Sequence, residues 1–235
     1  MFGKMISLTI GYLFGCFLTA EPVARKYAGK GASEIGDTGN PGMANIMENL
    51  GFVPGMITLA GDLGKTVVAG LISYGLFRES GWIVALYSGL GCTIGHDFPF
   101  WRKFRGGKGV ATSSLAFIMY SFPLGVFANR KFRGGKGVAT TSMAIVFYAF
   151  LSGLAANIAG MLVVFATKYL CIGGPVIPLC FLLLMIIRGD REAAVLAGVF
   201  TALSVYAHGR AILDIREGKT KKTDVIGAIL KRGDQ

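Results

Sequence analysis

Residues 95–112 read GHDFPFWRKFRGGKGVAT, a basic and glycine-rich stretch between two apolar segments. From position 102 the chain repeats itself: residues 102–129 read RKFRGGKGVATSSLAFIMYSFPLGVFAN, and residues 130–157 read RKFRGGKGVATTSMAIVFYAFLSGLAAN. The first part, RKFRGGKGVAT, is identical in both copies. Glycines expose backbone N–H groups and let the backbone approach a ligand, while Lys and Arg supply positive charge. Such a loop favours a tetrahedral anion, so we expect a phosphate-handling site at a water–lipid boundary.

The composition is that of a membrane protein. The chain has 235 residues, of which 53% are hydrophobic and 16% charged, and its mean hydropathy is +0.58. Soluble domains carry about 25% charged residues, and here the apolar residues form long blocks. The net charge of +11 suggests nucleic acid at first, but the basic residues lie in short loops between apolar blocks. There they orient helices and bind anionic groups. We therefore predict an all-α polytopic membrane protein with no nucleic-acid partner.

Eight apolar segments are candidates for membrane helices, within a single domain over residues 1–235. Several are short for a bilayer, which needs about 20 apolar residues, and Gly and Pro interrupt them, as neighbouring helices permit. The 35 glycines allow close helix packing. The first block has no A-x-A-like cleavage site, so we expect it to be a retained helix. The segments are 5–20, 52–77, 81–94, 110–128, 138–152, 154–169, 175–187 and 193–206.

The basic residues predict an orientation. Loops 21–51 and 95–109, the second copy and the tail from 209 are rich in Lys and Arg, whereas the opposite loops are charge-balanced. The positive-inside rule then places the basic loops and the C-terminus in the cytoplasm and the N-terminus outside. About seven helices satisfy this rule, and one more full span would invert everything beyond it. We therefore expect the duplicated segment to be re-entrant or an additional helix in the interface, with breaks at Phe122–Pro123 and Gly125.

Three further constellations carry candidate chemistry. His96 and His208 each follow an apolar block, and two histidines at cytoplasmic helix ends beside basic loops favour function over a structural role. Asp62 and Lys65 share a helical face inside an apolar block; we expect a structural ion pair first and a substrate contact second. Residues 36–45, GDTGNPGMAN, have Thr and Asn that can donate to phosphate, although an ordinary loop and helix cap fits too. The four cysteines show no C-x-x-C pattern, so we predict no metal site.

These motifs together resemble the PlsY-type family of bacterial membrane glycerol-3-phosphate acyltransferases. The family pattern runs GSGNxGATN, then D-x-x-K-G, then GHxFPxxxxFxGGKGVAT, then R-H-R-x-N after the last helix and a G-T-E. The matches are Gly39, Asn40, Pro41, Gly42 and Asn45, the pair Asp62 and Lys65, and nearly all of residues 95–112. His208 lies at the expected place after the last helix, and the resemblance covers about residues 36–218.

The resemblance implies a multi-pass protein of the bacterial inner membrane, with seven helices and a site at the cytoplasmic face. It implies that an acyl group moves from acyl phosphate to the 1-hydroxyl of glycerol 3-phosphate, giving lysophosphatidate and phosphate. It implies membrane lipid around the site, no cofactor and no obligate protein partner. Catalytic roles fall on His96, Lys108 and His208. Substrate-binding roles fall on Thr38, Gly39, Asn40, Gly42, Asn45, Arg105, Gly106, Gly107, Gly109 and Arg210.

The sequence departs from the family pattern where glycerol 3-phosphate would bind. Glu48 stands where the family has Arg, and Ala211 stands where it has Asn. We hypothesise that Arg210, Lys219 or Lys136 supplies the missing cation. The alternative is a non-catalytic or altered-acceptor relative that binds a phosphate-bearing lipid or anion, and anion transport ranks last because the repeat is a direct tandem rather than inverted.

Either copy of the glycine loop can be the working one. Lys108 follows His96 at the family spacing, whereas Lys136 is contiguous with the helix that continues into residues 157–169. Because the spacing of histidine and loop is the chemistry-bearing unit, we predict that Lys108 is the active lysine.

Overall fold

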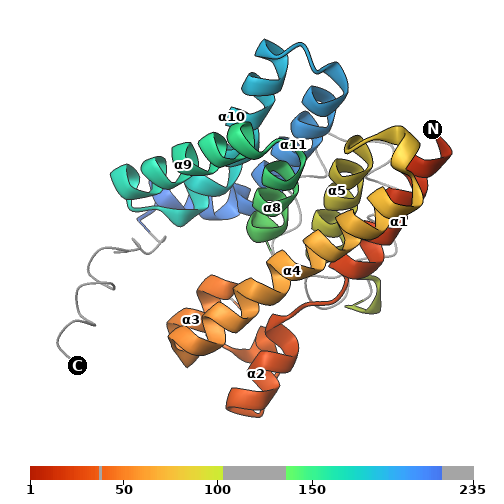
Figure 1. Ribbon diagram of the computed structural model, residues 1–235. Coiled ribbons are helices and arrows are strands. Elements are labelled where there is room, and N and C mark those ends of the chain that lie inside the picture. The colour runs from red at the N-terminus through yellow and green to blue at the C-terminus, as the bar shows by residue number, and fades with distance from the viewer. Residues whose placement is uncertain (37–38, 103–135, 219–235) are drawn as a thin grey trace, which may run out of the picture. The chain divides into compact units, whose positions relative to one another are not determined.

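The computed structural model describes residues 1–36, 39–102 and 136–218, and all regular structure in these ranges is helical (Figure 1). The chain divides into two compact units, Met1–Tyr148 and Ala149–Gln235. Within the described ranges, five helical segments are long and apolar enough to cross a membrane: Phe2–Ala28, Phe52–Leu76, Phe150–Thr167, Leu170–Ile187 and Arg191–Ile215. The predicted all-α class is confirmed, while the single domain over the whole chain stays a prediction.

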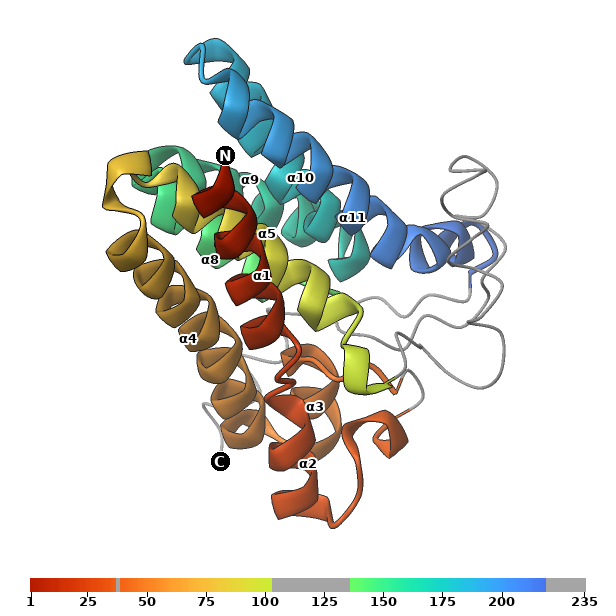
Figure 2. The ribbon, with the colours of Figure 1, turned by 90° about the vertical axis from the view of Figure 1, so that its right-hand side faces the viewer.

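The first unit is built around three helices that lie side by side, α1, α4 and α5 (Figure 2). The helices α2 and α3 pack against each other and against α4, and α8 packs against α4 and α5. The bounds are α1 Phe2–Gly15, α2 Ala20–Ala28, α3 Met43–Leu50, α4 Phe52–Leu76, α5 Ile83–Asp97 and α8 Val138–Tyr148. Short 3-10 turns occupy Ala32–Glu34 (η1), Arg78–Ser80 (η2) and Phe100–Arg102 (η3).

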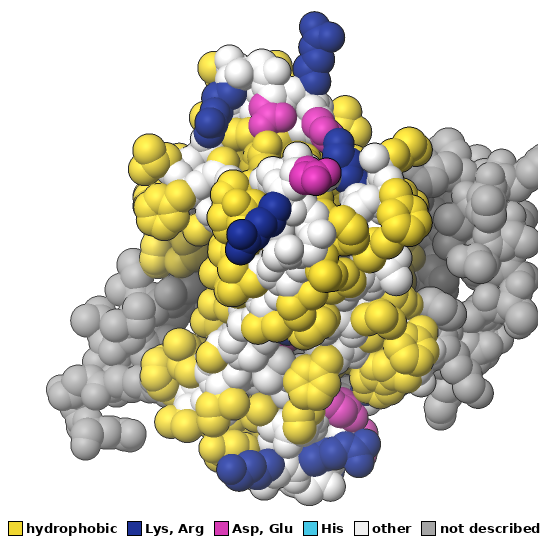
Figure 3. Space-filling view, turned by 45° about the vertical axis from the view of Figure 1, so that its right-hand side comes forward, with side chains coloured by type: hydrophobic (Ala, Val, Ile, Leu, Met, Phe, Trp, Pro, Cys, Tyr) yellow, Lys and Arg dark blue, Asp and Glu magenta, His cyan; other side chains and the backbone are white. Residues whose placement is uncertain are grey.

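The longest helix of this unit, α4, has apolar side chains on its exposed side and many polar side chains on its buried side. Its exposed positions include Phe52, Val53, Met56, Ile57, Val68, Leu71, Ile72 and Leu76. Its buried positions include Thr58, Asp62, Lys65, Thr66 and Ser73. In Figure 3 hydrophobic side chains likewise cover much of the visible face, and charged side chains gather toward its ends. This is the pattern of a helix that faces lipid with one side and a polar interior with the other.

Glycines bring α1 and α5 into backbone contact. Two lie on each helix at a spacing of four residues: Gly11, Gly15, Gly91 and Gly95. A Cβ atom at any of them would collide with a backbone carbonyl of the other helix. Small residues at this spacing let membrane helices approach closely, where van der Waals packing rather than the hydrophobic effect holds them together.

The second unit is a bundle of α9 (Phe150–Thr167), α10 (Leu170–Ile187) and α11 (Arg191–Arg216), in which α10 packs against both neighbours. Gly160 on α9 and Gly173 on α10 face each other, and a Cβ on either would lie 3.1–3.2 Å from the other's carbonyl oxygen. Asp190 caps α11, because its Oδ1 accepts a hydrogen bond of 3.1 Å from the Ala193 N–H.

Several predicted boundaries are wrong. The segment 21–51, predicted as a loop, contains α2 and α3, because Val23, Ala24 and Ile46 form part of a buried apolar cluster. The segment predicted over 138–152 breaks at Ala149, where α8 has ended and α9 begins. The helix predicted from 175 begins at Leu170, since prolines are tolerated inside membrane helices.

The last helix also runs further than its apolar block. α11 continues through residue 216 rather than ending near 206, because residues 207–216 are mostly helix formers and Arg210 pairs with Asp214 at 3.9 Å, one turn on. His208 and Arg210 therefore lie within this helix, not after it. The segment 110–128, with the predicted breaks at Phe122–Pro123 and Gly125, lies outside the described residues.

The glycine contact of α1 and α5 makes a testable prediction. Gly91→Ala places a methyl group against the Leu8 carbonyl and should destabilise the protein by about 1–3 kcal/mol, the usual cost of overpacking. Gly75→Ala on α4 is the matched control, because a Cβ there meets nothing within 4 Å. We expect Gly91→Ala to lower the unfolding temperature measured by circular dichroism in detergent, with Gly75→Ala unchanged or higher. Equal behaviour of the two variants would contradict this packing.

Candidate active site

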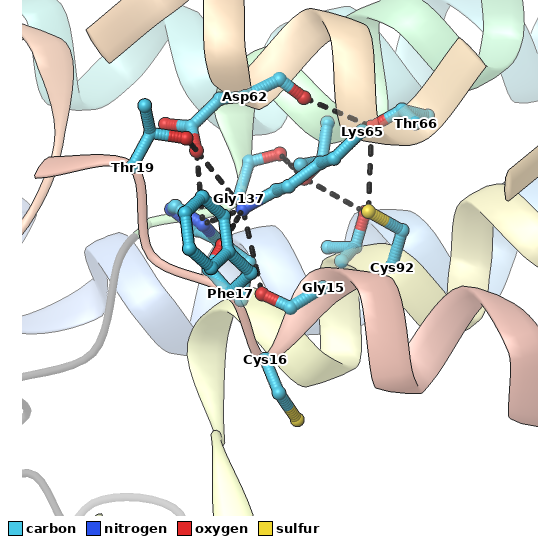
Figure 4. Close-up of polar contacts among 12 residues, drawn as sticks. Gly15, Cys16, Phe17, Thr19, Asp62, Lys65, Thr66, Cys92 and Gly137 are labelled. Carbon is cyan, nitrogen blue, oxygen red and sulfur yellow. Dashed lines mark hydrogen bonds and ion pairs between the residues drawn. The ribbon is translucent and has the colours of Figure 1, made fainter. Parts of the chain in front are cut away.

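A buried ammonium group, that of Lys65 on α4, joins several polar partners in the first unit (Figure 4). Its Nζ lies 2.9 Å from Asp62 Oδ1 and 2.9 Å from His96 Nδ1, and it donates to the Phe17 carbonyl at 2.7 Å. The Gly15 carbonyl is a longer contact at 3.4 Å. These carbonyls are free to accept because α1 ends at Gly15, and the last carbonyls of a helix have no partner within it. The end of α1 thus offers the lysine both acceptors and the negative end of a helix dipole.

The partners of this ammonium are as deeply buried as Lys65 itself. Only 5% of the Lys65 side chain and 3% of the Asp62 side chain are exposed. Asp62 Oδ1 also accepts a hydrogen bond of 3.1 Å from Thr19 Oγ1 in the connection between α1 and α2. The structure therefore joins Asp62 and Lys65 as the sequence suggested, and it adds His96 to the pair.

The lysine fixes the tautomer of His96. An ammonium group has only donors, so the His96 Nδ1 that lies 2.9 Å from it must accept. The ring is then neutral and carries its proton on Nε2. His96 is placed in the last turn of α5, and it can donate a hydrogen bond from Nε2 to an oxygen.

Four hydrogen bonds attach the segment after His96 to the region from α1 to η1. The Tyr12 hydroxyl donates to the Phe98 carbonyl at 3.1 Å, and the Trp101 indole N–H donates to the Cys16 carbonyl at 2.6 Å. Arg102 then donates to Glu21 Oε2 at 3.2 Å and to the Ser33 hydroxyl at 3.3 Å. The start of the basic loop is thereby held at a fixed place beside the cluster of Asp62, Lys65 and His96.

The described part of the motif at 36–45, residue 36 and residues 39–45, includes the turn before α3 and the first residues of that helix. The Asn45 side chain, 5% exposed, donates to the Ile35 carbonyl at 2.9 Å and accepts from Asn49 at 3.2 Å. Gly39 has a φ of +55°, and a Cβ there would come 2.6 Å from the Ser33 carbonyl oxygen. Gly42 is the N-cap of α3, and Asn40 is half-buried two residues before it. Asn45 and Gly39 therefore stabilise the local backbone conformation. A substrate-binding loop would need the same stabilisation.

His208 lies in the second unit, and its tautomer is the opposite of that of His96. Its Nδ1 is 2.9 Å from the Ser204 carbonyl, which can only accept, so Nδ1 carries the proton and Nε2 is the acceptor. The ring is 2% exposed and packs on Gly174 of α10, where a Cβ would lie 2.7 Å from Nε2. Arg210, two residues further along α11, is exposed.

Six of the predicted site residues lie outside the described ranges and stay predictions: Thr38, Arg105, Gly106, Gly107, Lys108 and Gly109. Sequence reasoning missed Asp97, which is 3% exposed and whose Oδ1 has no hydrogen-bond partner among the described residues. Its position in the sequence, directly after His96 at the end of an apolar block, could have marked Asp97 as a candidate site residue. The part of the chain that the structure describes holds no group of three His, Cys, Asp or Glu residues that could bind a metal.

A helical fold that buries a lysine, an aspartate and a histidine together among apolar helices defines an integral membrane protein with a polar site in its interior. Residues 5–130 and 128–218 each match the model of the glycerol-3-phosphate acyltransferase family. The chain belongs to this family, and each of the two matched segments contains one copy of the repeated loop.

Individual relatives are similar to this chain over nearly its whole length. Glycerol-3-phosphate acyltransferase 1 of Lactobacillus johnsonii is 31% identical over 97% of this chain and 97% of its own length. The glycerol-3-phosphate acyltransferase of Clostridioides difficile is 31% identical over 94% of this chain and 96% of its own. The fold is similar to the crystal structure of PlsY, an integral membrane glycerol 3-phosphate acyltransferase, in its glycerol 3-phosphate form: the TM-score is 0.73, with 21% identity, over 96% of this chain and 98% of that one.

The buried ion pair predicts non-additive stability. Lys65→Met leaves the Asp62 carboxylate buried without its cation, and removing one partner of such a pair costs about 3–5 kcal/mol. Adding Asp62→Asn removes the stranded charge, so the double variant should unfold at a higher temperature than Lys65→Met alone. A double-mutant cycle of unfolding temperatures measures this coupling, and strictly additive losses would show that the two residues do not depend on each other.

Proposed function

We propose that this chain transfers an acyl group from an acyl phosphate to the 1-hydroxyl of glycerol 3-phosphate, giving lysophosphatidate and phosphate. Membership in the glycerol-3-phosphate acyltransferase family supports acyl transfer to glycerol 3-phosphate in phospholipid synthesis. The observation that carries the proposal is His96, whose Nδ1 accepts from Lys65 in a buried cluster at the end of α5, directly before the basic loop in the sequence. The acyl phosphate donor is proposed because the cations and backbone N–H groups of that loop suit a phosphate.

The chemistry needs one bond to form and one to break. The glycerol 1-oxygen bonds to the acyl carbonyl carbon, and the bond from that carbon to the phosphate oxygen breaks. The hydroxyl proton leaves with the phosphate, which is itself a base, so no side-chain general base is required. His96, donating from Nε2, would stabilise negative charge that develops on an oxygen, as donors in an oxyanion hole do.

The other predicted residues take supporting roles in this proposal. His208 accepts at Nε2, so it would orient the hydroxyl group of the acceptor. Lys65 directs its ammonium group to Asp62, His96 and backbone carbonyls, so we assign it the structural role and not a substrate contact. The loop of residues 36–45 and Arg210 are proposed to contact the phosphate of the acceptor. Glu48, exposed on α3, stands where the family pattern has a cation.

An assay of purified protein in lipid vesicles tests the function. Palmitoyl phosphate and glycerol 3-phosphate should yield phosphate and lysophosphatidate together, whereas palmitoyl-CoA should yield neither. His96→Ala should lower kcat/KM by about 100-fold or more, the usual cost of removing one oxyanion-hole donor. Glu79→Gln, at an exposed position in η2, is the control and should retain activity.

The products separate the alternatives. Phosphate without lysophosphatidate would point to a different acceptor and would make Glu48 the first residue to exchange for Arg. No phosphate and no lysophosphatidate from a folded protein would contradict the proposed reaction.

We further propose about seven membrane helices in the bacterial inner membrane, with the site facing the cytoplasm. Five long helices support this count, together with the shorter α5 and α8. The basic residues of α2 and η3 support a cytoplasmic end, and the charge-balanced turn at η2 supports an outer one. The duplicated segment would then be re-entrant or an additional interfacial helix.

Labelling of single cysteines tests this orientation in a variant whose four native cysteines are replaced by Ser. Arg25→Cys and Glu79→Cys both introduce a thiol at an exposed position. In intact spheroplasts a membrane-impermeant maleimide should label Glu79→Cys, and it should label Arg25→Cys only after permeabilisation. The reverse pattern would place the site on the outer face.

A further inference from the structure

The chain carries two identical stretches, at 102–112 and 130–140, and both contain the Gly-Gly-Lys-Gly of the proposed phosphate loop. The structure describes the second copy from Lys136 onward, and it places this copy against α5.

The turn at Gly137 fits against α5 only because it is glycine. Its φ is +59°, in the left-handed region that other residues seldom adopt. A Cβ at Gly137 would lie 2.7 Å from Thr93 Cγ2 and 3.1 and 3.2 Å from the two carboxylate oxygens of Asp97. The turn is buried and lies with the Lys65 cluster in Figure 4. The last turn of α5, which carries His96, is therefore in contact with the final glycine of the second loop.

Buried threonines hold this contact in register. The Thr93 hydroxyl on α5 lies 3.1 Å from the Thr140 hydroxyl and 3.2 Å from the Thr141 hydroxyl, and both belong to the first turn of α8. Thr140 also donates to the Gly137 carbonyl at 2.9 Å, which closes the turn on the helix. All three threonines are at most 4% exposed. The two copies differ at this point: Thr141 of the second copy corresponds to Ser113 of the first, which lacks the methyl group of threonine.

The charge of Asp97 is a second reason for the second loop to lie against the end of α5. Its carboxylate is 3% exposed, and its Oδ1 has no hydrogen-bond partner within the described ranges. A buried carboxylate needs compensation, and the N-terminus of α8, with its unpaired N–H groups and positive dipole, begins at the residue after Gly137. A positive helix end would compensate such a carboxylate, and the structure shows the Gly137 position, directly before α8, in contact with Asp97.

From these contacts we infer that Lys136 of the second copy, not Lys108, binds the phosphate of the acyl donor, and that Asp97 positions its loop. The inference rests on the proposed function, and it replaces the choice of Lys108 that spacing along the sequence favoured. Lys136 directly precedes Gly137, and Asp97 directly follows His96. The contact of Gly137 with Asp97 therefore brings the loop lysine to the helix end that carries the histidine.

Matched variants of the two copies test the inference on the full-length protein in lipid vesicles. The activity of the wild type with palmitoyl phosphate and glycerol 3-phosphate decides the proposed function by itself. Given that activity, Lys136→Ala should lower kcat/KM for palmitoyl phosphate at least tenfold more than Lys108→Ala does. Lys136→Arg, which keeps the charge, should recover part of the loss. A loss for Lys108→Ala as large as that for Lys136→Ala would overturn the inference and leave the proposed function standing.

A binding measurement gives a readout that does not need turnover. Palmitoylphosphonate, which cannot release its phosphorus group, serves as the probe in isothermal titration calorimetry. Its Kd should rise at least tenfold in Lys136→Ala and in Gly137→Ala, and it should rise less in Lys108→Ala and in Gly109→Ala. Equal shifts in both copies would contradict the assignment.

Asp97→Asn tests the positioning role, because it keeps the shape of the side chain and removes its charge. We expect the KM for palmitoyl phosphate to rise severalfold with a much smaller change in kcat. Asp190→Asn is the control, since that carboxylate also lies at a helix N-terminus, that of α11. If Asp97→Asn leaves KM unchanged, or if both variants raise it equally, Asp97 does not position the loop.

Discussion

The ammonium group of Lys65 sets the requirement on which the first unit depends. A cation among membrane helices is tolerated only where hydrogen-bond acceptors surround it. The surrounding lipid and apolar side chains do not offset the free energy of hydration that the ammonium group loses. Three elements supply the acceptors: α4 gives Asp62, α5 gives His96, and the end of α1 gives the Gly15 and Phe17 carbonyls. The termination of α1 at Gly15 is therefore part of the site and not only a boundary of a helix.

Glycine supplies the accuracy that this arrangement needs. Gly91 and Gly95 allow α5 to touch the backbone of α1, and Gly95 directly precedes His96. A backbone contact leaves fewer alternatives than a contact of flexible side chains, so the histidine ring is placed within reach of the lysine. The same principle recurs in the second unit, where Gly174 receives the ring of His208. In both units, a glycine that a hydropathy plot treats as neutral decides where the ring of a histidine lies.

The sequence predicted the features that depend on pattern and missed those that depend on contacts. The class, the extent of α4 and the pairing of Asp62 with Lys65 follow from apolar blocks and from helical spacing, which are local properties. The end of α11 was misplaced because hydropathy reports where lipid ends, and a helix of Arg, Ala and Leu continues into water. The tautomers of His96 and His208 depend on one acceptor or donor each, Lys65 or the Ser204 carbonyl, and no linear pattern reveals these partners.

For the duplicated loop, spacing along the chain and contacts in the fold favour different copies. Identical residues have identical propensities, so only the surroundings separate Lys108 from Lys136. The extra copy lengthens the sequence between η3 and α8, and the contact of α8 with α5 is nevertheless present among the described residues. The buried Thr140 and Thr141, at the start of the helix after the loop, select that contact. Our inference therefore favours the copy that is joined to α8 over the copy that is joined to His96, because the contacts of α8 with α5 are the ones that the structure shows.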